Sequence, residues 1–105
     1  MKYTVRPKAW LDFEESMTYL RAEANEETAI RFWLRAQETF EGLARQPGAG
    51  RSRPDLKPDG LRSWRVNDFE KRLVFYLTHE TAVEIFRVRH GMTNLPEIFT
   101  GDENA

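Results

Sequence analysis

The stretch from Leu61 to His90 constrains the fold most, because it contains three short apolar or alternating segments separated by turn residues. The turns are expected at Asn67-Asp68 and at Thr78-His79-Glu80, which are residue types that favour turns. Runs of this length, rich in β-branched and aromatic residues, predict consecutive strands. The three predicted strands are Leu61–Val66, Lys71–Leu77 and Thr81–Arg89.

Alternation within these strands predicts which side chains share a face. Lys71–Leu77 is apolar on both faces, with Phe75 on one and Tyr76 on the other, as expected of a central strand. In the last strand one face is expected to carry Val83, Ile85, Arg87 and Arg89, and the other Ala82, Glu84, Phe86 and Val88.

Two helices are predicted before this sheet, after a short strand at Tyr3–Arg6. Pro7 suits the first turn of a helix, and Asn25 suits the N-cap of the next. The apolar arc of the first helix is expected to contain Ala9, Trp10, Phe13, Ser16, Met17, Leu20 and Ala24, and its polar side Asp12, Glu15, Tyr19 and Glu23. The arc of the second is expected to contain Ala29, Phe32, Trp33, Ala36, Phe40 and Leu43. The short link between them predicts an antiparallel hairpin that covers one face of the sheet.

Ile30 and Leu34 lie off the main arc of the second helix, four residues apart. Packing against the first helix is the interpretation that we favour, and exposure for a partner is the alternative. The segment Pro47–Gly60 is rich in Pro and Gly, so no regular element is expected there. We favour a solvated connector over a loop whose bases contact phosphates.

The expected fold class is α+β, in the order β-α-α-β-β-β, with a helical hairpin packed on a small, mainly antiparallel sheet. Residues 1–105 are expected to form a single domain. Residues 94–99 are expected to form a short turn or helix, and residues 100–105 to be frayed. The face of the sheet opposite the hairpin is expected to be open, and to contact the target.

Composition excludes several kinds of chemistry. The chain has no cysteine, which removes disulfides, thiolate nucleophiles and cysteine-bound zinc, and its two histidines are far apart. We therefore expect no metal and no cofactor. The sequence has no apolar run long enough to cross a membrane and no apolar N-terminal stretch, so we expect a cytoplasmic protein without membrane association.

Charge is distributed unevenly although the net charge is only −1. Residues 51–90 contain nine Lys/Arg against six Asp/Glu, which makes the predicted sheet basic. The sequence contains no GxGxxG, P-loop, GxSxG or HExxH motif. The polar candidates on the sheet are Arg62, Arg65, Arg72, Tyr76, Arg87, Arg89 and His90. Such a set fits phosphate chemistry, or a docking surface for DNA or an acidic protein segment, and each arginine alone also fits a solvated surface.

The order of elements, together with the segments LRSWRV, KRLVFYL and VEIFRVRHGMTNL, resembles the RelE/ParE family of bacterial toxins from type II toxin–antitoxin modules. The resemblance extends from Tyr3 to about Phe99. The IFRVRHG segment, followed by Leu-x-x-Ile-Phe, is similar to the pattern that ends the sheet in ParE-like members.

The resemblance implies two rival activities. RelE-like members cut ribosome-bound messenger RNA without a metal, and ParE-like members inhibit DNA gyrase and are not known to need a catalytic centre. Gly91 follows His90 where some nucleases have tyrosine, which favours the gyrase inhibitor and leaves enzymatic activity uncertain. A nuclease site would use Arg65, Arg87 and His90. The candidates for target binding are Arg62, Arg65, Arg72, Arg87, Arg89 and His90.

The resemblance also implies a cognate antitoxin with an acidic, amphipathic C-terminal segment, and a hetero-oligomeric complex with it. The candidates for antitoxin binding are Ile30, Leu34, Arg72 and Tyr76. The remaining hypothesis is a protein-interaction module that has kept this fold and lost toxicity.

Overall fold

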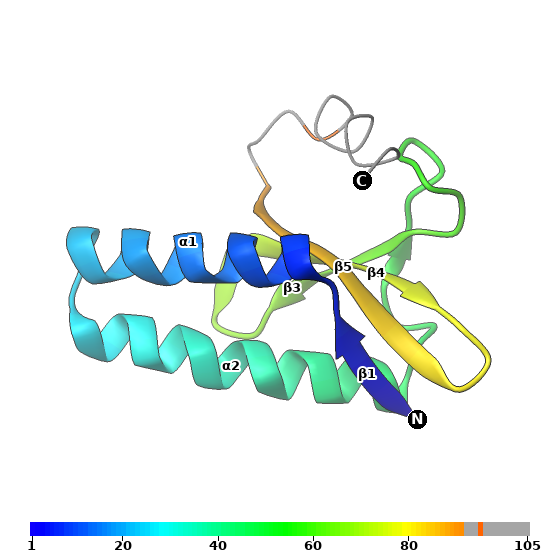
Figure 1. Cartoon of the computed structure of the whole chain (residues 1–105), viewed down its shortest axis with the longest axis horizontal. Coiled ribbons are helices and arrows are strands. Elements are labelled where there is room, and N and C mark those ends of the chain that lie inside the picture. The colour runs from blue at the N-terminus through cyan, green and yellow to red at the C-terminus, as the bar shows by residue number, and fades with distance from the viewer. Residues whose placement is uncertain (92–94, 96–105) are drawn as a thin grey trace.

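The computed structural model describes residues 1–91 and Leu95, and in these residues an α-helical hairpin packs on one face of a β-sheet (Figure 1). The elements in chain order are β1 (Lys2–Val5), α1 (Pro7–Glu23), α2 (Glu26–Arg45), β2 (Arg51–Ser52), β3 (Arg62–Val66), β4 (Phe69–Thr78) and β5 (Ala82–His90). The predicted α+β class is confirmed. The expectations for residues 92–94 and 96–105 lie outside the described residues.

The sheet has five strands in the order β1-β5-β4-β3-β2. All neighbours are antiparallel except β1 and β5, which run parallel with Lys2 opposite Ala82 and Val5 opposite Ile85. The two-residue strand β2 lies in a segment expected to have no regular element. That expectation was wrong because this short extended piece pairs with the edge of β3.

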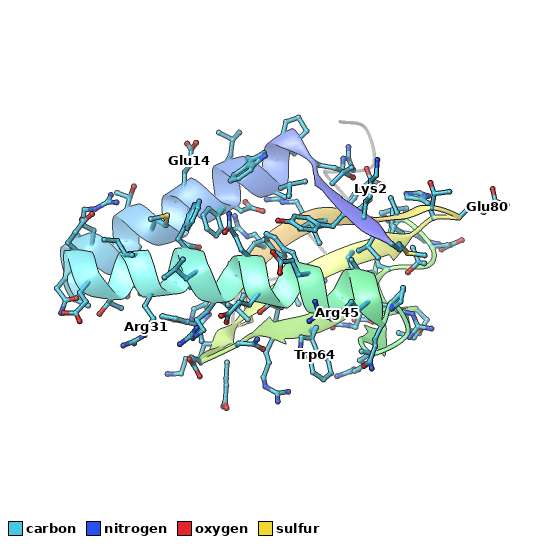
Figure 2. The ribbon with its side chains drawn as sticks, turned by 90° about the horizontal axis from the view of Figure 1, so that it is seen from below. Lys2, Glu14, Arg31, Arg45, Trp64 and Glu80 are labelled. Carbon is cyan, nitrogen blue, oxygen red and sulfur yellow. The ribbon has the colours of Figure 1, made fainter. Side chains whose placement is uncertain are left out.

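The helices begin where the sequence predicts. Pro7 is in the first turn of α1, and the side chain of Asn25 caps α2 by accepting a hydrogen bond from the Thr28 N–H at 2.7 Å. Figure 2 shows the two helices side by side, with Glu14 and Arg31 projecting from the hairpin. The hairpin therefore presents one long surface to the sheet and another to solvent.

Apolar cores lie on both faces of the sheet. Between the hairpin and the sheet, Phe13 stacks on Phe32 with ring centroids 5.3 Å apart. On the opposite face, a second cluster contains Leu56, Leu61, Phe75, Phe86 and Leu95. The expectation of an open basic face was therefore wrong, because this face is apolar and the segment bearing Leu56 folds over it.

A register shift in β5 changes the face of several side chains. Tyr76 pairs with Ile85 while Phe75 pairs with Arg87, so Phe86 is the extra residue of a β-bulge. Phe86 joins the second cluster, whereas Val88 joins the core beneath the hairpin. The prediction that Phe86 and Val88 share a face was wrong, because strict alternation does not allow for a bulge.

Two tryptophans assigned to the apolar arcs are partly exposed. Trp10 is 45% exposed on α1 and Trp33 is 37% exposed on α2. Trp10 still packs edge-on against Phe13, at 5.8 Å between ring centroids. Asp12, expected on the polar side, is instead 5% exposed. The buried surface of α1 is thus rotated from the predicted arc toward Asp12.

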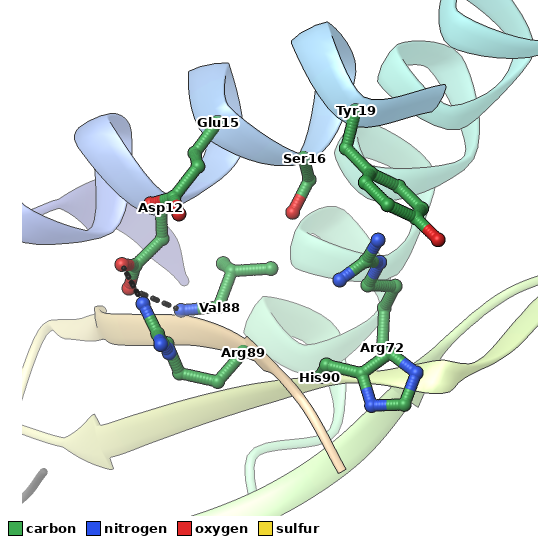
Figure 3. A pocket seen from close by; sticks show the side chains of 8 residues that line it. All are labelled: Asp12, Glu15, Ser16, Tyr19, Arg72, Val88, Arg89 and His90. Carbon is green, nitrogen blue, oxygen red and sulfur yellow. Dashed lines mark hydrogen bonds and ion pairs between the residues drawn. The ribbon is translucent and has the colours of Figure 1, made fainter. Parts of the chain in front are cut away.

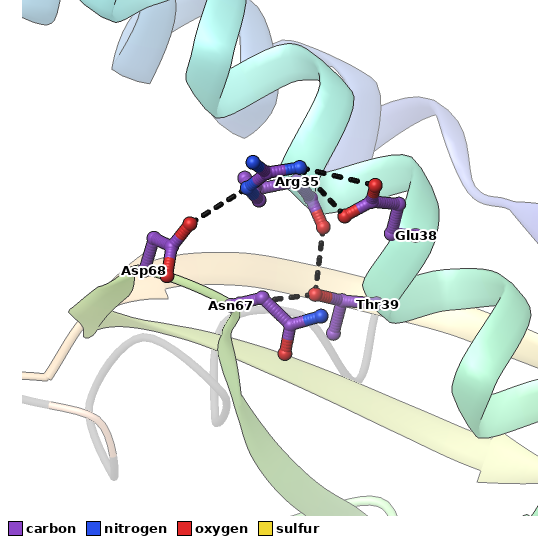
Figure 4. Close-up of polar contacts among 5 residues, drawn as sticks. All are labelled: Arg35, Glu38, Thr39, Asn67 and Asp68. Atoms are coloured by element: carbon purple, nitrogen blue, oxygen red, sulfur yellow. Dashed lines mark hydrogen bonds and ion pairs between the residues drawn. The ribbon is translucent and has the colours of Figure 1, made fainter.

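The turn between β3 and β4 is attached to α2 (Figure 4). The buried Thr39 hydroxyl donates to the Arg35 carbonyl at 2.8 Å and accepts from the Asn67 N–H at 3.0 Å. Arg35 also donates to Asp68 at 2.6 Å and pairs with Glu38. Asp68 has a φ of 67°, a left-handed conformation that Asp tolerates in tight turns. These contacts fix the start of β4 relative to the hairpin.

Candidate functional site

The Asp12 carboxylate binds the last strand at several points (Figure 3). It accepts from Arg87 Nε at 2.6 Å and Nη2 at 3.0 Å, and from Arg89 Nη1 at 3.0 Å. The Val88 backbone N–H also donates to it at 3.1 Å. Because β1 pairs with β5 only as far as Ile85, Asp12 supplies an acceptor that a neighbouring strand would otherwise provide.

Arg87 therefore stabilises the fold from within the protein and is not part of an exposed binding face. It is 8% exposed, and the two sites of contact with Asp12 make a bidentate pair. From the sequence, Asp12 was expected in the solvent and Arg87 on a binding face. No sequence signal links these residues, since 75 positions separate them and only the packing of α1 against β5 brings them together.

Beside this ion pair lies a hollow of about 270 Å³ between α1 and the ends of β4 and β5 (Figure 3). It brings together three of the predicted site residues, since Arg72 and His90 are opposite each other across the two strands and Arg89 is adjacent. Its full lining is Asp12, Glu15, Ser16, Tyr19, Arg72, Val88, Arg89 and His90. We call it the arginine hollow.

Arg72 is a partly buried cation in this hollow. Its guanidinium lies over the Tyr19 ring, 5.4 Å from the centroid, and it forms no side-chain hydrogen bond or ion pair within residues 1–91 and Leu95. Burial lowers the pKa of Arg72, and the charge of Arg89 adds to this effect, while Tyr19 and Glu15 oppose it. The hollow therefore holds a positive charge that its surroundings stabilise poorly.

A second hollow of about 510 Å³ adjoins the first and shares Tyr19, Arg72 and His90 with it. The rest of its lining is Leu20, Asp68, Phe69, Glu70 and Lys71. We call it the mixed hollow, because it presents apolar surface together with charges of both signs. Together the two hollows form a groove along the C-terminal half of α1.

The remaining cations of the predicted site lie elsewhere. Arg62 donates to the Gly50 carbonyl at 2.8 Å and so holds the segment before β2. Arg65 is exposed on β3, with its guanidinium 5.0 Å from the Trp64 ring centroid. It lines a separate hollow with residues of α2 and the β3–β4 turn. Arg65 and His90 therefore line different hollows, and Arg87 is held by Asp12.

The candidates for antitoxin binding differ in their exposure. Ile30 is 48% and Leu34 47% exposed, and with Trp33 they lie on one side of α2. The favoured interpretation that Ile30 and Leu34 pack against the first helix was wrong. Tyr76 is completely buried, and its hydroxyl donates to the Pro47 carbonyl and accepts from the Gly50 N–H, both at 2.8 Å. In this fold Tyr76 cannot touch a partner, because it anchors the connector to the sheet.

Two bases of that connector are neutralised locally. Arg53 donates to Asp55 at 2.9 Å and 3.1 Å, and Lys57 to Asp59 at 2.8 Å. Hydrogen bonding from these bases lowers the pKa of both carboxyls. The connector therefore offers little unpaired positive charge for phosphates.

The described part of the chain contains no cluster of three or more His, Asp or Glu that could hold a metal ion. Among the same residues, neither helix has the length and apolar character needed to cross a membrane.

The strand β1, the two helices and then the strands β3, β4 and β5 follow one another in the order on which the resemblance to the RelE/ParE family rests. Residues 3–95 match the family described as the ParE toxin of the type II toxin–antitoxin system parDE. The chain belongs to the ParE toxin family.

The fold is also that of a solved structure described as the chromosomal ParDE TA system from P. aeruginosa. The TM-score is 0.71 and the sequence identity 17%, over 86% of this chain and 95% of the other. At this identity the similarity establishes the fold alone. No individually curated protein matches the sequence.

Proposed function

We propose that this ParE family toxin inhibits DNA gyrase and that a cognate antitoxin neutralises it in a hetero-oligomeric complex. The observation that supports gyrase inhibition over messenger RNA cleavage is that the residues a nuclease would need lie apart. Arg87 is bound to Asp12, Arg65 lines another hollow than His90, and the buried Tyr76 cannot transfer a proton to a substrate. A protein that acts by binding needs no such assembly.

Binding of an antitoxin is supported by the exposed apolar side of α2. Ile30, Trp33 and Leu34 recur at the spacing that an amphipathic partner helix contacts, and such surface is costly to leave in water. Binding there, together with an acidic segment near Arg72, would occupy both the hairpin and the arginine hollow. In the cell we expect growth arrest when the toxin is expressed alone, and a cytoplasmic location, where gyrase acts.

The test is a supercoiling assay with purified gyrase and purified toxin, alongside a translating extract. We expect loss of supercoiling or accumulation of cleaved DNA, with ribosome-bound messenger RNA intact. Codon-dependent cuts in the messenger without an effect on gyrase would establish the RelE-like alternative. Absence of both effects, from a protein with a folded amide spectrum, would establish an interaction module without toxicity.

A further inference from the structure

The arginine hollow contains hydrogen-bond donors without acceptors. Arg89 uses Nη1 for Asp12, but its Nε is buried and has no hydrogen-bond partner within the described residues. Arg72 also forms no ion pair within the described residues. Burial lowers its pKa, which shows that its positive charge is poorly compensated. Buried donors are normally paired, so the orphaned Nε of Arg89 beside the partly buried cation of Arg72 indicates a site that is completed by a ligand.

The geometry points to an oxyanion as that ligand, and we propose that the hollow binds a side-chain carboxylate of an acidic peptide segment. The Arg72 guanidinium is held over Tyr19, and Arg89 is held by Asp12, so both arginines are oriented before the ligand arrives. A carboxylate accepts hydrogen bonds from such donors through both of its oxygens. The volume of about 270 Å³ is ample for this group.

The adjoining mixed hollow distinguishes a peptide from a nucleic acid. Leu20 and Phe69 offer apolar contact immediately beside Arg72, which suits an apolar side chain next to the acid. Asp68 and Glu70 line the same hollow and would repel the successive phosphates of a nucleic-acid backbone. Glu15 at the arginine hollow acts in the same direction. The groove therefore fits one acid flanked by apolar residues better than a run of negative charges.

This inference rests on the proposed function in one respect, because it identifies the peptide as the acidic segment of the antitoxin. Asp12 acquires a positioning role, since it holds Arg89 while leaving Nε for the ligand. Neutralisation of the toxin would then include binding of an antitoxin carboxylate to the unpaired donors of the arginine hollow.

The experiment follows the arginine Nε–H signals of the purified protein by NMR. The probes are acetyl-Leu-Glu-amide, its glutamine counterpart, inorganic phosphate and a short DNA duplex. We expect saturable shifts of the Arg89 and Arg72 signals with the glutamate peptide, and at least about tenfold weaker binding of the glutamine peptide, as for loss of a charge-assisted pair. Equal effects of the two peptides would overturn the proposal, and so would binding of phosphate or DNA but not peptide.

A matched pair of variants separates the hollow from general charge. Arg72→Gln is expected to reduce the affinity for the glutamate peptide at least about tenfold. Arg45→Gln changes an exposed residue in the last turn of α2 and is expected to leave this affinity unaltered. Equal losses in both variants would show a nonspecific effect of charge and reject the site. The peptide titration contains no gyrase, so a negative gyrase assay does not affect the conclusion about the hollow. Likewise, a negative peptide titration does not affect the conclusion about gyrase.

Discussion

Asp12 and Arg87 form a bidentate ion pair that joins the middle of α1 to the last strand, with Oδ2 2.6 Å from Nε and Oδ1 3.0 Å from Nη2. Both side chains are nearly inaccessible, at 5% and 10% exposure. The pair lies next to the arginine hollow, so the same carboxylate supports the fold and orients Arg89.

Replacing Arg87 by Ala is expected to destabilise the protein on the order of 3 kcal/mol, because it leaves a buried carboxylate with fewer donors. Urea denaturation followed by tryptophan fluorescence measures the change. Arg45→Ala, an exposed substitution, is the control and is expected to shift the midpoint little. If Arg87→Ala unfolds at the wild-type urea concentration and is inactive, Arg87 belongs to the binding surface after all.

Arg72→Gln is expected to change the free energy of unfolding by no more than about 0.5 kcal/mol, despite the partial burial of this side chain. Arg72 has no ion pair to lose within the described residues, and removing it relieves repulsion by Arg89. Thermal and urea unfolding should both report this. A loss comparable to that of Arg87→Ala would mean that Arg72 stabilises the fold through a contact that the hollow does not explain.

Tyr76→Phe is expected to cost about 1–3 kcal/mol, because the Gly50 N–H and the Pro47 carbonyl lose their partner. Burial also raises the pKa of Tyr76 above the usual 10.0. Above about pH 10 the unfolded chain loses this proton first, so the wild type becomes less stable as the pH rises. Unfolding curves between about pH 9 and pH 11 should show a steeper decline for the wild type than for Tyr76→Phe. Parallel declines would contradict this assignment.

Thr39→Val should destabilise the attachment of the β3–β4 turn by about 1–2 kcal/mol, since valine has the same shape but cannot accept from the Asn67 N–H. Hydrogen exchange at the Asn67 amide is the most direct measurement, and it should become faster in the variant. Thr18→Val, on the exposed side of α1, serves as the control. Unchanged protection of Asn67 would show that the ion pairs of Arg35 hold the turn without Thr39.

The double variant Ile30→Ser, Leu34→Ser is expected to keep its stability, since both side chains are about half exposed. Its affinity for the antitoxin should fall at least about tenfold, the effect of losing two apolar anchors. Calorimetric titration with the purified antitoxin tests this, and Leu11→Ser, 63% exposed on α1, is the matched control. Equal affinity of the double variant and the wild type would place the antitoxin elsewhere.

Much of the architecture could be predicted because local signals determine it. Pro7 and Asn25 mark the helix starts, and the apolar runs around Phe75 predict a central strand, as observed. The bulge at Phe86 was not predicted, because the adjacent apolar residues Ile85 and Phe86 fit a strand that is apolar on both faces as well as a bulge. It is the tertiary pairing with β4 that reveals it.

The candidate site was predicted in part. Arg72, Arg89 and His90 were named from the sequence, and the structure brings them to one hollow. Asp12 was missed because a lone carboxylate beside an apolar arc is usually solvated, and its burial depends on how α1 lies against β5. Tyr76 was wrongly expected to bind the antitoxin. The sequence does not reveal that its hydroxyl is buried and hydrogen-bonded to backbone groups of a distant connector.

The parallel pairing of β1 with β5 also determines when the toxin can complete its fold during synthesis on the ribosome. Lys2–Val5 is made before both helices, but its partner Ala82–Ile85 is made only after both helices and the strands that follow them. Contacts this distant in sequence form late and slow the folding of the whole sheet. Since Arg72 and Arg89 converge only when β4 and β5 are paired, nascent chains cannot present the arginine hollow, and a partner that recognises it would meet finished toxin molecules.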